Sequence, residues 1–167
     1  MSAERWFGQL LDLAAAVAWR EEQRAAERRV VFTNGCFDVL HSGHVEFLAW
    51  ARSQGDALVV GLNDDDSVTR LKGASRPIEP FAHRARMLQA LRSVDVVVGF
   101  SQRTPEVILE RIRPDVHTKS AQYREEELPE RAVVLQHGGV ICLAPHIAGS
   151  STTQTIARIL ARYADRD

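Results

Sequence analysis

Two histidines stand three residues apart in the stretch FTNGCFDVLHSGHVEFL, which begins at residue 32. A pair at this spacing on the first turn of a helix lies on one helix face. Imidazole N–H groups can donate hydrogen bonds to phosphate oxygens, and the N-terminus of a helix favours an anion. Gly43, between His41 and His44, has no side chain, so a ligand can approach the backbone closely. We therefore predict that the two histidines bind phosphate.

Two other interpretations of the histidines remain open. In a metal site they would need further ligands, and Cys36 and Asp38 are close in the sequence. The chain has no CxxC or HExxH pattern, however, so we assign no metal ligand. The histidines could also be ordinary structural residues.

Two further segments carry groups that suit phosphate. In GSSTTQ, Ser151 and Gln154 fit a capping box, which would need no ligand, but the run has more hydroxyl groups than a cap requires. In NDDDSVTRLKGASRP, Arg76 offers a bidentate fork and Lys72 a point charge, with a solvated surface loop as the alternative. The chain has no GxxxxGK[ST], no GxGxxG and no nucleophile elbow.

The elements that must position these groups alternate between strand and helix. Short β-branched runs predict five strands, at residues 28–35, 57–63, 95–100, 115–119 and 140–144. Helical spacing predicts helices over residues 4–27, 42–54, 80–92, 104–115 and 150–163, the second of them capped by Ser42. This order predicts an α/β fold with a Rossmann-like, doubly wound parallel sheet of five strands. Ligands bind beyond the carboxyl ends of such strands, which is where all three segments fall.

Composition narrows the class of protein. The chain has 167 residues, 45% of them hydrophobic and 26% charged, and a net charge of −1, so nothing in its composition indicates a bulk nucleic-acid binder. Two cysteines are too few for a disulfide framework, and the longest N-terminal apolar run is too short to span a bilayer and lacks the features of a signal peptide. We expect a cytoplasmic protein with no membrane or nucleic-acid partner. We divide it into an amphipathic helix, residues 1–28, and one domain, residues 29–167.

The first motif adds a family resemblance. VVFTNGCFDVLHSGH resembles the start of the cytidylyltransferase-like nucleotidyltransferases, whose signature His-x-Gly-His is residues 41–44 here and whose Ser-Thr-Thr helix start is residues 151–153. The most similar branch is that of the D-glycero-β-D-manno-heptose 1-phosphate adenylyltransferases, the ADP-heptose synthases of lipopolysaccharide biosynthesis. The stretches TNGCFD, GLNDDDSVTRLKG, RPI, R-x-x-x-L-x-A-L-x-x-V-D and TP follow that branch in order. The resemblance covers roughly residues 29–163.

The resemblance implies a function. The expected reaction transfers AMP from ATP to a sugar 1-phosphate, giving an ADP-sugar and pyrophosphate, with Mg²⁺ accompanying the nucleotide. The alternative is a CTP-dependent cytidylyltransferase that acts on glycerol 3-phosphate or another small phosphate or phosphonate. A minor alternative is a nucleotide-binding protein without catalysis.

The resemblance also implies a role for individual residues. The catalytic residues would be His41, His44 and Lys72. The nucleotide would be bound by Thr33, Asn34, Gly35, Cys36, Phe37, Gly43, Gly149, Ser150, Ser151, Thr152 and Thr153. The sugar phosphate side would be bound by Asp38, Asn63, Arg76 and Lys119, and Asp38 would orient its loop or a Mg²⁺.

One stretch departs from the branch, which usually has Lys-Gly-Gly-Asp-Tyr after the fourth strand. This chain has Lys119-Ser120-Ala121-Gln122-Tyr123, and a neutral glutamine cannot replace aspartate in a charged contact. The departure leaves three alternatives to the full activity of the branch open: a different sugar, a different base preference or reduced activity. Some family members carry a fused sugar kinase, and these residues contain none, so we expect any kinase to be a separate chain. We also expect a homodimer.

Overall fold

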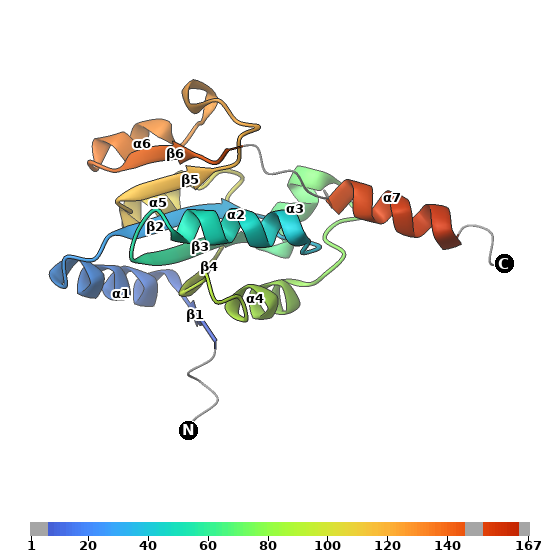
Figure 1. The fold of residues 1–167 in the computed structure, drawn as a ribbon, viewed down its shortest axis with the longest axis horizontal. Coiled ribbons are helices and arrows are strands. Elements are labelled where there is room, and N and C mark those ends of the chain that lie inside the picture. Colours follow the sequence, from blue (N-terminus) through green and yellow to red (C-terminus); the bar gives the residue numbers. More distant parts are fainter. Residues whose placement is uncertain (1–6, 146–151, 164–167) are drawn as a thin grey trace.

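The computed structural model describes residues 7–145 and 152–163, and it is built around one sheet of six parallel strands (Figure 1). Their order across the sheet is β1-β4-β3-β2-β5-β6. The bounds are Gln9–Leu11 for β1, Val30–Gly35 for β2, Ala57–Asn63 for β3, Val96–Phe100 for β4, Val116–Lys119 for β5 and Val140–Leu143 for β6.

Helices cover both faces of the sheet, as a doubly wound sheet requires. Those of one face are α1 (Leu13–Ala25), α5 (Glu106–Ile112) and α6 (Arg131–Gln136), and those of the other are α2 (Ser42–Arg52) and α4 (Phe81–Gln89). Helix α3 (Asp65–Lys72) follows β3, and a short 3₁₀ helix, η2, spans Glu125–Glu127. Helix α7 (Thr152–Tyr163) extends away from the sheet at the right of Figure 1.

The strands bury side chains on both faces. Successive residues of a strand point to opposite sides, so Val30 and Phe32 join the core under α1 and α5, whereas Val31 joins the core under α2 and α4. All seven residues of β3 are buried. This explains why the central strands appear in the sequence as continuous apolar runs rather than as alternating ones.

The predicted fold class is confirmed, with one strand more than expected. The continuous helix predicted over residues 4–27 is wrong at its start, because Gln9–Leu11 forms β1 and pairs in parallel with β4. The Asp12 side chain then accepts a hydrogen bond of 2.8 Å from the Ala15 N–H and caps α1. A strand of three residues is too short to show alternation, and its apolar residues also fit the helical spacing of the residues that follow. The boundary between residues 28 and 29 stays a prediction.

Two local predictions also need correction. The sequence predicts no helix between residues 64 and 72, but α3 forms there, and the Asp64 side chain accepts a hydrogen bond of 2.8 Å from the Ser67 N–H. Ser42 is the first residue of α2 rather than its cap. The cap is His41, whose side chain makes no capping hydrogen bond.

The order of the strands changes direction at β2. From β2 the chain moves outward through β3 and β4, and it then returns to place β5 and β6 on the other side of β2. At the carboxyl ends of β2 and β5, the connections that follow these two strands therefore run in opposite directions. Such a switch point is the usual place for a ligand in an open α/β sheet. Within the described residues, no helix combines the length and the apolar composition that a membrane crossing requires.

Candidate active site

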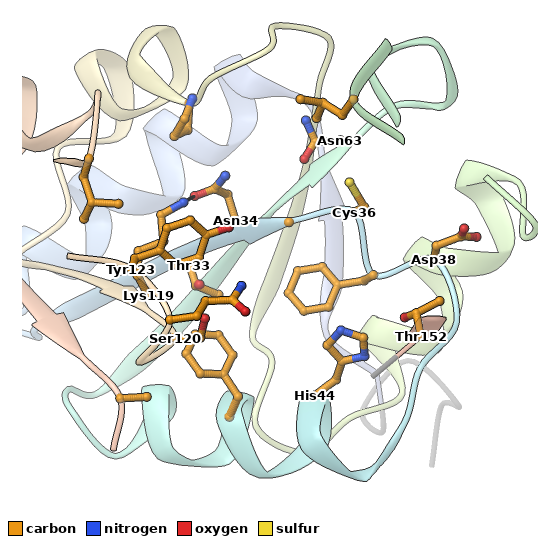
Figure 2. A pocket seen from close by; sticks show the side chains of 18 of the residues that line it. Thr33, Asn34, Cys36, Asp38, His44, Asn63, Lys119, Ser120, Tyr123 and Thr152 are labelled. Atoms are coloured by element: carbon orange, nitrogen blue, oxygen red, sulfur yellow. Dashed lines mark hydrogen bonds between the residues drawn. The ribbon is translucent and has the colours of Figure 1, made fainter. Parts of the chain in front are cut away.

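A cavity of about 780 Å³ opens at the carboxyl ends of β2, β3 and β5. Residues from all three predicted segments line it (Figure 2). The predicted site residues among them are Thr33, Asn34, Gly35, Cys36, Phe37, Asp38, His41, Gly43, His44, Asn63, Lys72, Arg76, Lys119, Thr152 and Thr153. The other three, Gly149, Ser150 and Ser151, lie outside the described residues.

The two histidines form a stacked pair at the start of α2. Their ring centroids are 3.8 Å apart, with 23° between the ring planes, and the Phe37 ring packs on His44 at 5.3 Å. Phe37 has a φ of 44°, in the left-handed region that costs energy for a residue other than glycine. A Cβ atom at Gly35 would lie 3.0 Å from the Phe37 ring, so the glycine leaves room for this arrangement.

Both histidines are suited to accepting a polar ligand. The two Nδ1 atoms are buried and have no hydrogen-bond partner among the described residues. Burial lowers the pKa of His41, and burial together with the neighbouring His41 lowers the pKa of His44 to about 4. Near neutral pH the pair is therefore uncharged in the free protein, and each ring carries one N–H donor.

A buried arginine fixes the loop that leads to the histidines. Arg84 in α4 is 0% exposed, and its Nη1 donates to the carbonyl oxygens of Cys36 at 2.6 Å and Asn63 at 2.8 Å. Its Nε donates to the carbonyl of Glu79 at 2.9 Å, and its Nη2 to the carboxylate of Asp65 at 2.6 Å. One guanidinium therefore joins the ends of β2 and β3 to α3 and α4. Sequence reasoning missed Arg84, since only the fold brings its partners together.

Asp38 holds the loop between α3 and α4 in place. It is 2% exposed, and its carboxylate accepts hydrogen bonds from Arg76 Nε and from the backbone N–H groups of Ile78 and Glu79. Both oxygens are thus bonded within the protein. Of the two roles expected for Asp38, the geometry favours orienting the loop over holding a Mg²⁺.

Two cations that line the cavity have no ion pair with any described residue. They are Lys72, at the end of α3, and Arg103, in the loop after β4. Lys72 was predicted from its segment, whereas Arg103 was not. The adjacent TP stretch resembles the family branch but does not point to Arg103, and only the position of β4 beside β3 brings this loop to the cavity.

Several predicted residues use their polar groups within the protein. Thr33 Oγ1 donates to the Thr118 carbonyl at 2.9 Å, Asn63 Nδ2 donates to Ser67 Oγ at 2.8 Å, and Thr152 Oγ1 donates to the Val39 carbonyl at 3.3 Å. The last of these bonds joins the start of α7 to the loop before the histidines.

The chemistry of the cavity is that of anion binding. Burial raises the pKa of the Cys36 thiol, which disfavours a nucleophilic thiolate. Within the described residues, no group of three or more His, Cys, Asp or Glu side chains could hold a metal ion. Two neutral histidines, two cations that have no ion pair with a described residue and the N-terminus of α2 instead offer groups to which phosphate can bind.

Comparisons with known proteins agree with this chemistry. Residues 32–152 match the family model described as cytidylyltransferase-like. The chain is 47% identical over 153 residues to a bifunctional protein HldE of Halorhodospira halophila, covering 92% of this chain and 32% of that protein. It is 48% identical over 152 residues to the bifunctional protein HldE of Gluconacetobacter diazotrophicus, covering 91% of this chain and 31% of that one. The chain thus spans about a third of the length of these relatives.

Two solved structures share the fold. A lipopolysaccharide core biosynthesis protein from Thermoplasma volcanium superposes with a TM-score of 0.60 at 24% identity, over 72% of this chain and 99% of that one. A pantoate-beta-alanine ligase from Francisella tularensis superposes with a TM-score of 0.62 at 12% identity, over 96% of this chain and 80% of that one.

Replacing Arg84 tests its role at the ends of the strands. The variant R84M leaves the carbonyls of Cys36 and Asn63 buried without their donor, so we expect the free energy of unfolding to fall by about 3 kcal/mol. The measurement is urea unfolding. The exposed Arg86 on the same helix is the control, since within the described part of the chain its side chain is recorded only against the Phe7 ring, and R86M is expected to cost less than about 1 kcal/mol. An equal fall in the free energy of unfolding of R84M and R86M would contradict the structural role of Arg84.

The histidine pair predicts a loss of stability in mild acid. His44 has a pKa of about 4 in the folded chain, and the unfolded value is about 6.5, so the unfolded chain takes up a proton first as the pH falls. Stability is then complete above pH 6.5 and decreases toward pH 4, with a contribution from His44 of about 2 kcal/mol between pH 7 and pH 4.5. In urea unfolding at both pH values, H44Q should lose less stability than the unmodified chain. If H44Q and the unmodified chain lose the same stability between the two pH values, His44 is not the source of the loss.

Proposed function

Because the chain belongs to the cytidylyltransferase-like family, we propose that it transfers AMP from ATP to D-glycero-β-D-manno-heptose 1-phosphate, giving ADP-heptose and pyrophosphate. The proposal is supported by identities of 46–48% with proteins named HldE over most of this chain. The structural observation that carries it is the stacked pair of His41 and His44, which opens α2 inside the cavity with both Nδ1 atoms unpaired among the described residues.

The reaction needs no general base and no covalent intermediate. A sugar phosphate is largely a dianion at neutral pH, because its second pKa is about 6. One of its oxygens attacks the α-phosphorus of ATP, and the bond from that phosphorus to the β-bridging oxygen breaks, so pyrophosphate leaves with the electron pair. Catalysis then consists of positioning the reactants and neutralising the charge that builds on the phosphates. This agrees with a cavity that offers donors and cations rather than a nucleophile.

Each group has a proposed role in this reaction. His41 and His44 donate to the triphosphate and stabilise the transition state, and Lys72 bridges the attacking and leaving groups. The backbone around Cys36 and Phe37 approaches the phosphates, and Thr152 and Thr153 begin the helix that holds the β- and γ-phosphates. Arg103, which has no ion pair with a described residue, adds a further cation to this side of the cavity.

Nucleotidyltransferases of this family use a nucleoside triphosphate and usually Mg²⁺. Asp38 is bonded within the protein and the described residues offer no cluster of ligands, so this chain does not fit a Mg²⁺ held by protein groups alone. A Mg²⁺ would instead enter on the phosphate oxygens of the nucleotide, where it neutralises charge.

Two partners belong to the proposal. A sugar kinase would have to supply the acceptor phosphate, since the reaction consumes a sugar that is already phosphorylated. A second copy of the chain is the other partner, and its support is α7, where Ile159 and Leu160 are 52% and 64% exposed.

The activity is tested by measuring pyrophosphate release with Mg²⁺, crossing ATP and CTP with heptose 1-phosphate and glycerol 3-phosphate. We expect turnover with ATP and heptose 1-phosphate only. Turnover with CTP or with glycerol 3-phosphate would mean that the segment from Lys119 to Tyr123 marks a changed substrate. Binding of ATP without pyrophosphate release in any combination would instead favour a protein that only binds nucleotide.

Replacing either histidine tests the transition-state role. We expect H41A and H44A each to lower kcat by about 10²–10³, the usual cost of removing one preorganised donor. H83A is the control, because His83 lies on α4 with 69% of its side chain exposed and does not line the cavity. This variant should remain within about twofold of the unmodified enzyme. Losses of less than a few-fold in both H41A and H44A would disprove the assigned role.

A further inference from the structure

A second polar cluster lines the cavity on the side of β5, and Glu130 is its centre. This residue stands at the N-cap position of α6, where its side chain makes no capping hydrogen bond. It is 1% exposed, yet it belongs to the cavity wall. Its Oε1 lies 2.7 Å from Lys119 Nζ and 3.1 Å from Nε2 of the fully buried His117. Two residues of β5 therefore converge on one carboxylate oxygen.

The cluster spans the switch point of the sheet. Lys119 Nζ also donates to Asn34 Oδ1 at 2.9 Å, and this bond joins the end of β5 to the end of β2. An ammonium group has three N–H donors, and no described residue takes up the third. The Tyr123 ring lies beside it, with its centroid 5.3 Å from Nζ. Figure 2 shows Asn34, Lys119 and Tyr123 together, apart from His44 and Thr152.

The charges within the cluster balance. Burial raises the pKa of Glu130, but the hydrogen bond from His117 and the charge of Lys119 outweigh that effect and lower the pKa to about 2. Burial lowers the pKa of His117, which is therefore neutral. One ammonium and one carboxylate remain, so the net charge is zero.

This balance suits a sugar better than a phosphate. A carboxylate 2.7 Å from the ammonium repels a phosphate dianion and cancels much of the attraction that Lys119 would exert. Hydroxyl groups carry no charge, and they both donate and accept hydrogen bonds. Lys119 offers a donor, Asn34 an amide and Tyr123 an apolar ring face, which is the set that a polyhydroxylated ring can use.

We propose that Glu130 is a positioning residue that turns Lys119 and Asn34 into a charge-balanced binding site for the hydroxyl groups of the sugar acceptor. The phosphate of the acceptor is bound on the opposite side of the cavity, where Lys72 and Arg103 have no ion pair with a described residue. This inference rests on the proposed function, because it assigns the two halves of the same acceptor to two parts of one cavity.

The test is the variant E130Q of the full chain, which keeps a partner for His117 and removes the balancing charge. We measure the KM for heptose 1-phosphate, the KM for ATP, kcat and the inhibition constant of inorganic phosphate as a competitor of the acceptor. The KM for heptose 1-phosphate should rise at least about tenfold, with kcat and the KM for ATP within about threefold. The inhibition constant of phosphate should stay the same or decrease, since no carboxylate then balances the positive charge of Lys119.

Two results would overturn the proposal. A parallel rise of the KM for heptose 1-phosphate and of the inhibition constant for phosphate would mean that Lys119 binds the phosphate. Unchanged constants in a folded E130Q would mean that the ion pair only supports the fold.

A double variant covers the case in which E130Q does not fold. K119M/E130M removes both charges together, which proteins tolerate better than one unpaired buried charge. It should show the same rise in the KM for heptose 1-phosphate with unchanged inhibition by phosphate, and an unaltered KM would refute the proposal. The control is D115N, which breaks the Arg20–Asp115 ion pair of 2.9 Å just before the other end of β5 and should leave all constants within about twofold.

Binding separates this inference from the proposed function. If the unmodified chain releases no pyrophosphate from ATP and heptose 1-phosphate, the proposed function is wrong. Calorimetric titration of heptose 1-phosphate and of inorganic phosphate, each with α,β-methylene-ATP present, then still tests the cluster. Weaker binding of heptose 1-phosphate alone in E130Q supports the inference, and an equal change for both ligands, or none, overturns it.

Discussion

The site depends on one buried guanidinium. Arg84 is fully enclosed, and it satisfies three backbone carbonyls and a carboxylate that lie at the ends of β2 and β3, before α4 and in α3. Buried carbonyls without a donor are costly, so these segments can approach one another only around such a donor. The strained Phe37 and the stacked histidines follow directly after the Cys36 carbonyl that Arg84 holds. The position of the loop that carries the histidines is therefore fixed from α4, outside the motif that contains them.

The parallel sheet divides the cavity into two electrostatic parts. The strand order reverses at β2, so the loops after β3 and β4 supply one side and the loop after β5 supplies the other. On the first side, Lys72 and Arg103 have no ion pair with a described residue. On the second, Lys119 is matched by Glu130. One cavity thus has two cations without an ion pair to any described residue on one side and a charge-balanced cluster on the other, and this is the division on which our proposal for the two halves of the acceptor rests.

The sequence predicted the elements better than their boundaries. Continuous apolar runs located the five longer strands, because strands buried on both faces need apolar side chains at every position. The same rule failed for β1, whose three residues are too few for any period to appear. It also gave no sign of α3, a short and polar helix whose start depends on the Asp64 side chain. A capping side chain such as that of Asp64 sets the start of a helix only once the preceding strand has fixed where the helix can begin.

The sequence by itself determined the fold class and which side chains of a contiguous motif stand together, because spacing along the chain fixes which face of a helix His41 and His44 share. Only the tertiary structure decided which charges remain available to a ligand. Lys119 and Arg76 look like free cations in the sequence, yet each is paired with a carboxylate that is 11 or 38 residues away. Charge pairing depends on distance in space, which the strand order sets and which no linear pattern records.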